Sequence, residues 1–247
     1  MNFKIVTATI LGLVALGQTA PTVYTSNATD ADVEFSDDVV AWGNPTFPSI
    51  YHTCNDTDIR MIKSAFMDSL EVSAYARDRL LNYGADDLFF NRWFGNGSLT
   101  TVLGTLDHLV EASKDGMLLR CDDIDGLCAK NPTTYPGYHR ATEDKETVIC
   151  DLFYQTKKPL SSICFEGNLV DVHPKHYAGV DMLHRYLHVS MMNLNGYIAE
   201  FAEDLDEIVE YAHSNTTYAV RNVDSYLYYM ADVYSSSVIE GGCLGKL

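Results

Sequence analysis

The sequence predicts a mainly α-helical protein of the α+β class, in which helices flank a small region of short strands and loops. Two observations predict this class. Apolar residues recur at helical spacing in the segment after Cys54 and again after Pro174. Between these segments, residues 118–165 hold four cysteines and short β-leaning runs, Thr147-Val148-Ile149 and Leu152-Phe153-Tyr154, a texture typical of strands and loops joined by disulfides.

The N-terminal fifty residues precede the predicted fold. Residues 1–20 have the pattern of a secretory signal peptide: Lys4, an apolar stretch too short to span a bilayer, and then small residues. Cleavage after Gly17 and cleavage after Ala20 both fit the pattern. Residues 21–50 are polar and acidic, and we expect a flexible leader. Residues 51–247 are then expected to form a single domain.

Five helices are expected in that domain. Asp56 and the two residues after it are suited to cap a helix that continues to Leu81, and a second helix is expected over residues 100–112. Pro174 fits a first helical position. The remaining helices are expected over residues 175–192, 199–213 and 223–233.

Cysteines and glycosylation motifs indicate an extracellular protein. The six cysteines are an even number and all follow the signal peptide, which favours disulfides: Cys54, Cys121, Cys128, Cys150, Cys164 and Cys243. Four Asn-x-Ser/Thr sequons are candidate N-glycan acceptors: Asn27, Asn55, Asn96 and Asn215. With the signal peptide, these features predict a secreted glycoprotein at the cell surface or in the cell wall.

The charge of the chain excludes some partners. The formal net charge is −17, and loss of Lys4 with the signal peptide leaves 34 acidic and 16 basic residues, or −18. Such a protein is repelled by nucleic acid and by anionic membranes, and no later stretch is apolar enough for a membrane span. The charge fits a protein that attracts cations, and it also fits plain solubility.

His184-Arg185-Tyr186-Leu187-His188 is the most informative motif. Histidines four residues apart on a helix lie on one face, so both imidazoles can reach the same metal ion. In the zinc-peptidase motif H-E-x-x-H, the residue after the first histidine is the glutamate that takes a proton from zinc-bound water. Arg185 occupies that position here and stays protonated, so it cannot be the base.

The rest of a metal site is less defined by the sequence. Asp181 shares the helix face of the histidines and is a candidate to orient one of them. Zinc requires a third protein ligand, which we expect from the acidic segment 199–213. Asp204 is the candidate there, because it lies on the same side as the apolar Ile208. The alternatives are a chance histidine pair and a solvated acidic helix. His173 and His176 are candidates for a second, weaker site or are exposed and inert.

The order of the motifs resembles a known family. From Tyr51 onward, the segment Cys121–Cys128, the segment Val148–Tyr154, the His-Arg-x-x-His helix and Asn222-Val223-Asp224-Ser225-Tyr226 resemble the deuterolysin (aspzincin) metallopeptidases of fungi. The H-R-x-x-H form is closer to the related fungal zinc- and pH-regulated surface proteins, the pH-regulated antigen family.

This resemblance implies a zincin-like fold with one Zn²⁺ site. It implies disulfides Cys54–Cys121 and Cys128–Cys150, with Cys164 and Cys243 left to pair. It also implies an aspartate as third ligand beside His184 and His188, and Asp204 is our choice. The peptidase Gly-Thr-x-Asp signature is missing, so Glu210 and Glu203 are kept as reserves.

Two functions fit these features of the sequence. The first is a secreted zinc-binding protein that serves zinc capture or cell-wall adaptation to low zinc and raised pH, with zinc, a surface zinc transporter or cell-wall components as partners and homo-oligomers allowed. The second is a peptidase with a displaced base, for which Glu200, Glu203 and Asp181 are the candidates. A metal-free wall protein is a third interpretation. Since a general base contributes ~10²–10⁴ in rate, the sequence favours a degenerate peptidase that binds zinc.

Overall fold

The computed structural model describes residues 46–247, all of which belong to one compact unit. The expected signal peptide, the leader up to residue 45 and the Asn27 sequon lie outside the described residues. The predicted end of the leader at residue 50 is too far along the chain, because Ser49–Ile50 already forms strand β1 of the folded unit. Phe47 explains this early start of the fold, since its ring packs edge-on against Phe66 with the centroids 4.5 Å apart.

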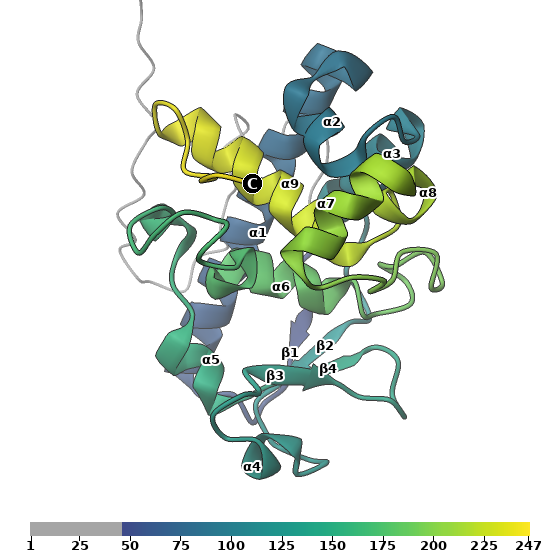
Figure 1. Cartoon of the computed structure of the whole chain (residues 1–247). Helices are drawn as coiled ribbons and strands as arrows, with labels where there is room; N and C mark the ends of the chain where they lie inside the picture. Colours follow the sequence, from purple (N-terminus) through teal and green to yellow (C-terminus); the bar gives the residue numbers. More distant parts are fainter. Residues whose placement is uncertain (1–45) are drawn as a thin grey trace, which may run out of the picture. The chain divides into compact units, whose positions relative to one another are not determined.

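A four-stranded sheet forms one part of the described unit (Figure 1), with the strand order β1-β2-β4-β3. Strands β1, β2 (Leu118–Arg120) and β4 (Glu146–Ile149) are parallel, whereas β3 (Gly137–His139) pairs antiparallel with β4. Tyr138 lies opposite Val148, and both are buried. The predicted run Thr147-Val148-Ile149 is therefore a strand.

The helices of the described residues are α1 (Asp56–Tyr83), α2 (Leu88–Phe94), α3 (Leu99–Glu111), α4 (Leu127–Lys130), α5 (Asp151–Thr156), α6 (Ala178–Tyr186), α7 (Leu205–Ser214), α8 (Thr216–Ala219) and α9 (Val223–Val238), with 3₁₀ turns η1 (Gly84–Asp86), η2 (Leu160–Ser162) and η3 (Pro174–His176). The predicted mainly α, α+β class is confirmed. The run Leu152-Phe153-Tyr154 is helical in α5, contrary to the predicted strand.

The core lies where α1 packs against α6 and α9 (Figure 1). Asn55 begins α1 with a capping box, in which its side chain accepts hydrogen bonds from the backbone N–H groups of Thr57 and Asp58. Gly179 allows the close approach of α6, because a Cβ there would collide with the α1 backbone at Asp68. This contact fixes the position of the helix that carries His184.

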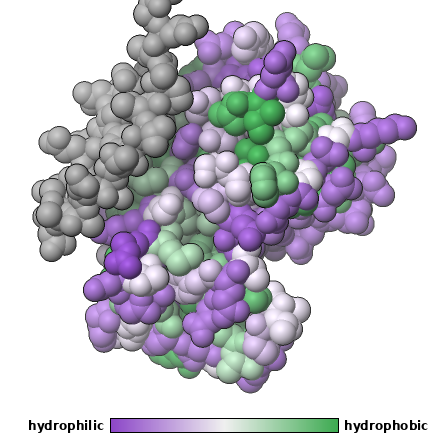
Figure 2. Space-filling model, turned by 90° about the vertical axis from the view of Figure 1, so that its left-hand side faces the viewer, coloured by the Kyte–Doolittle hydropathy of each residue, from purple (hydrophilic) through white to green (hydrophobic). Residues whose placement is uncertain are grey.

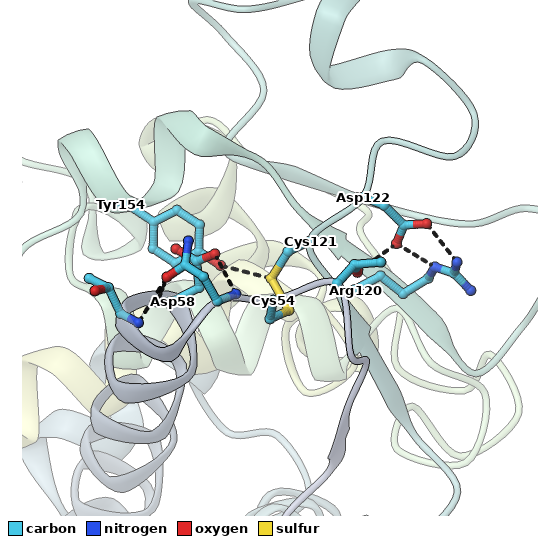
Figure 3. Close-up of a disulfide and its surroundings, with 9 residues drawn as sticks. Cys54, Asp58, Arg120, Cys121, Asp122 and Tyr154 are labelled. Atoms are coloured by element: carbon cyan, nitrogen blue, oxygen red, sulfur yellow. Dashed lines mark hydrogen bonds and ion pairs between the residues drawn. A yellow bond between two sulfur atoms is a disulfide. The ribbon is translucent and has the colours of Figure 1, made fainter.

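Three disulfides connect the described chain: Cys54–Cys121, Cys128–Cys150 and Cys164–Cys243. They match the pairing that the family resemblance implies. Figure 3 shows the first one, which ties the start of α1 to the residue after β2, with the hydroxyl of Tyr154 3.3 Å from Cys121 Sγ. Closing loops of 67, 22 and 79 residues restricts the unfolded chain and so stabilises the fold.

The surface fits a water-exposed protein. The face shown in Figure 2 is largely hydrophilic, with small hydrophobic patches among the polar residues. Asn55 and Asn96 are exposed, and Asn215 is half-buried between α7 and α8, so these three sequons lie at the surface of the described residues. Within residues 46–247, no helix combines the length and the apolar character needed to cross a bilayer.

Candidate metal centre

Helix α6 and the turn after it bring the two histidines of the motif together. The helix ends at Tyr186, earlier than the predicted Met192, and its predicted first turn is the separate 3₁₀ turn Pro174–His176. His188 lies in the turn that continues α6, where its N–H donates to the Arg185 carbonyl. The Nε2 atoms of His184 and His188 are 3.1 Å apart. The motif therefore converges although only its first histidine lies within the helix.

Glu200 is the third member of this cluster. One carboxylate oxygen, Oε1, lies 2.5 Å from Nε2 of His184 and 3.6 Å from Nε2 of His188. The segment that carries it is extended, and Ala199 forms a β-bridge with Asn222. Asn222 Oδ1 accepts hydrogen bonds from the backbone N–H groups of Phe201 and Ala202. These bonds hold Glu200 in place against the two histidines.

Burial and hydrogen bonding shape the charges of the cluster. Burial is the largest influence on His184 and lowers its pKa, against the opposing effect of Glu200. The hydrogen bond from His184, followed by that from His188, holds the pKa of Glu200 far below its usual range. At neutral pH, Glu200 is therefore a carboxylate and His184 a neutral imidazole, which are the charge states in which these groups bind a metal.

The acidic residues chosen from the sequence lie elsewhere. Asp204 caps helix α7, where its side chain accepts from the N–H of Asp206, and so the structure does not bring it to the histidines. Glu210 is exposed on α7 and belongs to no ligand cluster of the described residues. Glu203 lies in a second group, with Glu200 and Asp224.

The sequence predicted Glu200 as a displaced base and Asp204 as the ligand, because Asp204 shares the inner side of Ile208 in a helix expected to start at Ala199. A capping signal could have corrected that boundary. Asp204 is a favoured N-cap residue and Glu207 follows it three positions later, a pattern that indicates a helix beginning at Leu205. With that start, Glu200 belongs to the extended chain before the helix.

Arg185 points away from the metal cluster. Its Nε donates to Asp181 Oδ2 at 2.7 Å, and Lys157 Nζ lies 2.7 Å from the other Asp181 oxygen. Asp181 and Arg185 are both buried. Burial raises the pKa of Asp181, but the charges of Arg185 and Lys157 outweigh it and lower the pKa overall. Asp181 therefore neither orients a histidine nor is free to act as a base.

Strand β3 accommodates the guanidinium of Arg185. A Cβ on Gly137 would collide with that guanidinium and with the Val148 carbonyl. The arginine at this position is thus part of the packing between α6 and the sheet. Arg185 therefore stabilises the core, whereas His184, the preceding residue, belongs to the cluster of candidate metal ligands.

The donor set fits a zinc ion. His184, His188 and Glu200 each offer one ligand atom, and these atoms lie within 4.8 Å of one another. Two nitrogen ligands of one tetrahedral zinc stand ~3.3 Å apart, since zinc–nitrogen bonds are ~2.05 Å. The observed separation of 3.1 Å between the two Nε2 atoms is close to this value. Two imidazoles and a carboxylate also match the ligand types of zinc sites with an open position.

The fold has a relative of known structure. A zinc peptidase from Grifola frondosa superposes with a TM-score of 0.53 at 15% sequence identity, covering 72% of this chain and 96% of the peptidase. The fold is therefore zincin-like, as predicted. The fold and the site together define a zincin-like protein with arginine where peptidases of the H-E-x-x-H type have glutamate.

Sequence comparison defines the group more narrowly. The chain belongs to the family described as "HRXXH: Putative peptidase family", whose model matches residues 3–246. Protein ZPS1 of Saccharomyces cerevisiae is 59% identical over 95% of both chains. The pH-regulated antigen PRA1 of Candida albicans is 35% identical over 81% of this chain and 67% of its own length. The major allergen Asp f 2 of Aspergillus fumigatus is 31% identical over 95% and 75%.

Proposed function

We propose that this protein is a secreted zinc-binding glycoprotein of the fungal cell surface, with a zincin-like site that holds Zn²⁺ without hydrolysing peptides. The observation that carries the proposal is the contrast between adjacent residues. His184 converges with His188 and Glu200, whereas Arg185 is bound to Asp181 in the core. The ligand set is retained, and the position of the catalytic base is used for packing.

His184, His188 and Glu200 would hold the ion. When bound in such a site, zinc polarises carbonyl oxygens and lowers the pKa of a water ligand. Peptide hydrolysis also needs a base, and the described candidates are engaged. Glu200 contacts both histidines, Asp181 is neutralised by Arg185 and Lys157, and Glu203 contacts Lys175. These contacts support a binding protein over a peptidase.

The relatives support the location. The names of two of them, antigen and allergen, fit proteins that meet the outside of the cell, and the name of one states regulation by pH. Disulfides and surface sequons in this chain fit the same environment. We extend to this protein a role in zinc capture or in cell-wall adaptation, with a surface transporter or a wall component as the acceptor of zinc.

Zinc content tests the binding half of the proposal. The full-length secreted protein and its His188→Ala variant are purified, saturated with zinc, desalted and analysed by mass spectrometry of metals. We expect about one zinc per chain in the wild type and a loss of nearly all of it in the variant. His213→Ala, which removes an exposed histidine outside the cluster, is the matched control. Equal zinc in wild type and His188→Ala would contradict the site.

Peptide hydrolysis tests the other half. The zinc-loaded wild type is incubated with a mixed peptide library, with and without a chelator, and products are followed by mass spectrometry. We expect no chelator-sensitive cleavage. Cleavage that resists serine- and cysteine-protease inhibitors and stops with the chelator would show a peptidase with a displaced base instead.

A further inference from the structure

A second group of carboxylates lies directly beside the metal centre. Glu200, Glu203 and Asp224 each place one oxygen within 4.8 Å of the others, so the two groups share Glu200. Asp224 comes from the first turn of α9 and has no exposed surface. Its Oδ1 has only two longer contacts, with His173 Nε2 at 3.2 Å and Lys175 Nζ at 3.3 Å, and its Oδ2 accepts no hydrogen bond from any described residue. A buried carboxylate oxygen without a hydrogen bond is costly, and a cation bound closer than the Lys175 ammonium would compensate it better than the present contacts do.

His173 borders Asp224 without being a ligand candidate. Its Nε2 lies 3.2 Å from Asp224 Oδ1, and its Nδ1 accepts a hydrogen bond from the Lys175 backbone N–H at 3.0 Å. Because Nδ1 of the neutral ring accepts this hydrogen bond, the ring proton is on Nε2. In this tautomer, Nε2 cannot bind a metal. His173 therefore positions Asp224 and leaves the ligand set all-oxygen.

Lys175 marks where a cation is attracted. Its Nζ lies 3.3 Å from Asp224 Oδ1 and 3.3 Å from Glu203 Oε2. Both distances exceed the ~2.7–2.9 Å of a good charge-assisted hydrogen bond, so the ammonium makes only long contacts with the two carboxylates. A hollow of about 530 Å³, lined by both His173 and Lys175, lies next to it. The lysine side chain thus has room to swing away from the carboxylates.

We propose that Glu200, Glu203 and Asp224 form a second divalent-cation site, which Lys175 vacates into the adjacent hollow when an ion binds. Three carboxylates and no nitrogen or sulfur ligand suit hard cations, of which Mn²⁺ and Ca²⁺ are examples. Competition with the tethered ammonium makes this site weaker than the histidine site. The inference rests on the proposed function only in sharing Glu200 as a ligand.

Manganese titration tests the second site. The full-length protein, saturated with zinc at the histidines, is titrated with Mn²⁺, and free Mn²⁺ is followed by its electron paramagnetic resonance signal. We expect one Mn²⁺ per chain beyond weak surface binding. Glu203→Gln removes an exposed ligand and should weaken binding by about tenfold or more, while Lys175→Met removes the competing charge and should tighten binding by about tenfold or more.

Matched variants separate a site from general surface charge. Glu207→Gln removes an exposed carboxylate of α7, and Lys158→Met removes a lysine that pairs with Glu166 instead. The proposal is wrong if Glu203→Gln matches Glu207→Gln, or if Lys175→Met matches Lys158→Met. His188→Ala distinguishes failure of the proposed zinc site from failure of the proposed second cation site, because it removes a zinc ligand that the second site does not use. Zinc that is unaffected by His188→Ala contradicts the proposed function, whatever the manganese result.

Discussion

Two charged clusters lie on different sides of the last turn of α6, and they differ in how their charges are balanced. The candidate metal site of His184, His188 and Glu200 consists of electron-pair donors, and these side chains are 19–34% exposed. The buried cluster of Asp181, Arg185 and Lys157 sets two cations against one carboxylate, with exposures of 3–12%. The first arrangement suits a bound cation, and in the second the single carboxylate is already paired with two cations.

The comparison shows how adjacent residues take different roles. Successive residues on a helix point about 100° apart, so His184 faces the extended segment around Glu200 while Arg185 faces strand β3. Replacing the catalytic glutamate by arginine therefore changes more than one chemical group. At this position, the arginine side chain packs in the core instead of taking part in catalysis. The reverse substitution, Arg185→Glu, is therefore expected to destabilise the fold.

Arg185→Glu is expected to change the free energy of unfolding more than any other substitution considered for these two clusters. The substitution removes one of the two cationic partners of the buried Asp181 carboxylate and adds a second carboxylate near Asp181 and Gly137. Breaking a buried ion pair typically costs about 3–5 kcal/mol. We expect the free energy of unfolding in urea to fall by at least this amount, with no peptidase activity gained.

A double variant sharpens this test. Asp181→Leu together with Arg185→Met replaces the pair by apolar side chains, and we expect it to recover much of the lost stability. An Arg185→Glu protein that unfolds at the wild-type urea concentration would contradict a structural role for the arginine. One that is stable and cleaves peptides would show a peptidase disarmed at a single residue.

Removal of the metal gives the second largest effect. A ligand present at 100 times its dissociation constant stabilises the folded state by about 2.7 kcal/mol. For a domain of this size, a chelator should then lower the Tm of the zinc-loaded wild type by roughly 5–10 °C. Calorimetry of His188→Ala with and without chelator is the control, and its Tm should not move. Equal shifts in both proteins would place the ion elsewhere.

The pH dependence of the metal-free protein gives the smallest effect. Burial lowers the pKa of His184 in the folded state, so the unfolded chain, with a pKa of ~6.5, binds the proton first. Stability due to His184 is therefore present at neutral pH and falls as the pH drops below ~6.5. The pKa of Asp181 is lowered too, so its contribution is present above ~3.8 and is lost only at lower pH.

Urea unfolding at pH 7, 6 and 5 distinguishes the contribution of His184 to the free energy of unfolding from that of Asp181. His184→Gln should flatten the loss of stability on acidification in this range. Burial of Asp68 raises its pKa to about 6, which stabilises the fold on acidification and opposes the effect of His184. The informative quantity is therefore the difference between wild type and variant at each pH. Parallel curves for the two proteins would contradict a partly buried, neutral His184.

Helix periodicity predicted most of the fold. Helices α1, α3 and α9 begin within a residue of the expected positions, because their apolar faces repeat clearly and Asn55 and Ser98 cap the first two. Helix α5 was missed, since six residues with an apolar run look alike in a strand and in a short helix.

The proximity of the two histidines could be predicted, but the identity of the third residue beside them could not. The spacing of His184 and His188 was sufficient to bring them together, because it is set by local geometry. The third residue depends on where the chain between α6 and α7 runs, and Asn222 fixes that segment from a distance of about twenty residues in sequence. The partner of Arg185 depends on Lys157 and β3 as well, and tertiary contacts of this kind have no periodic signature.

The central claim is that Glu200, and not Asp204, completes the metal centre with the two histidines. The most direct measurement is the zinc affinity of wild type, Glu200→Ala and Asp204→Ala, determined by competition with a chromophoric chelator near pH 7. We expect Glu200→Ala to lose about 100-fold in affinity or more, by loss of a ligand, and Asp204→Ala to bind zinc as the wild type does. Wild-type affinity in Glu200→Ala together with a large loss in Asp204→Ala would contradict the account.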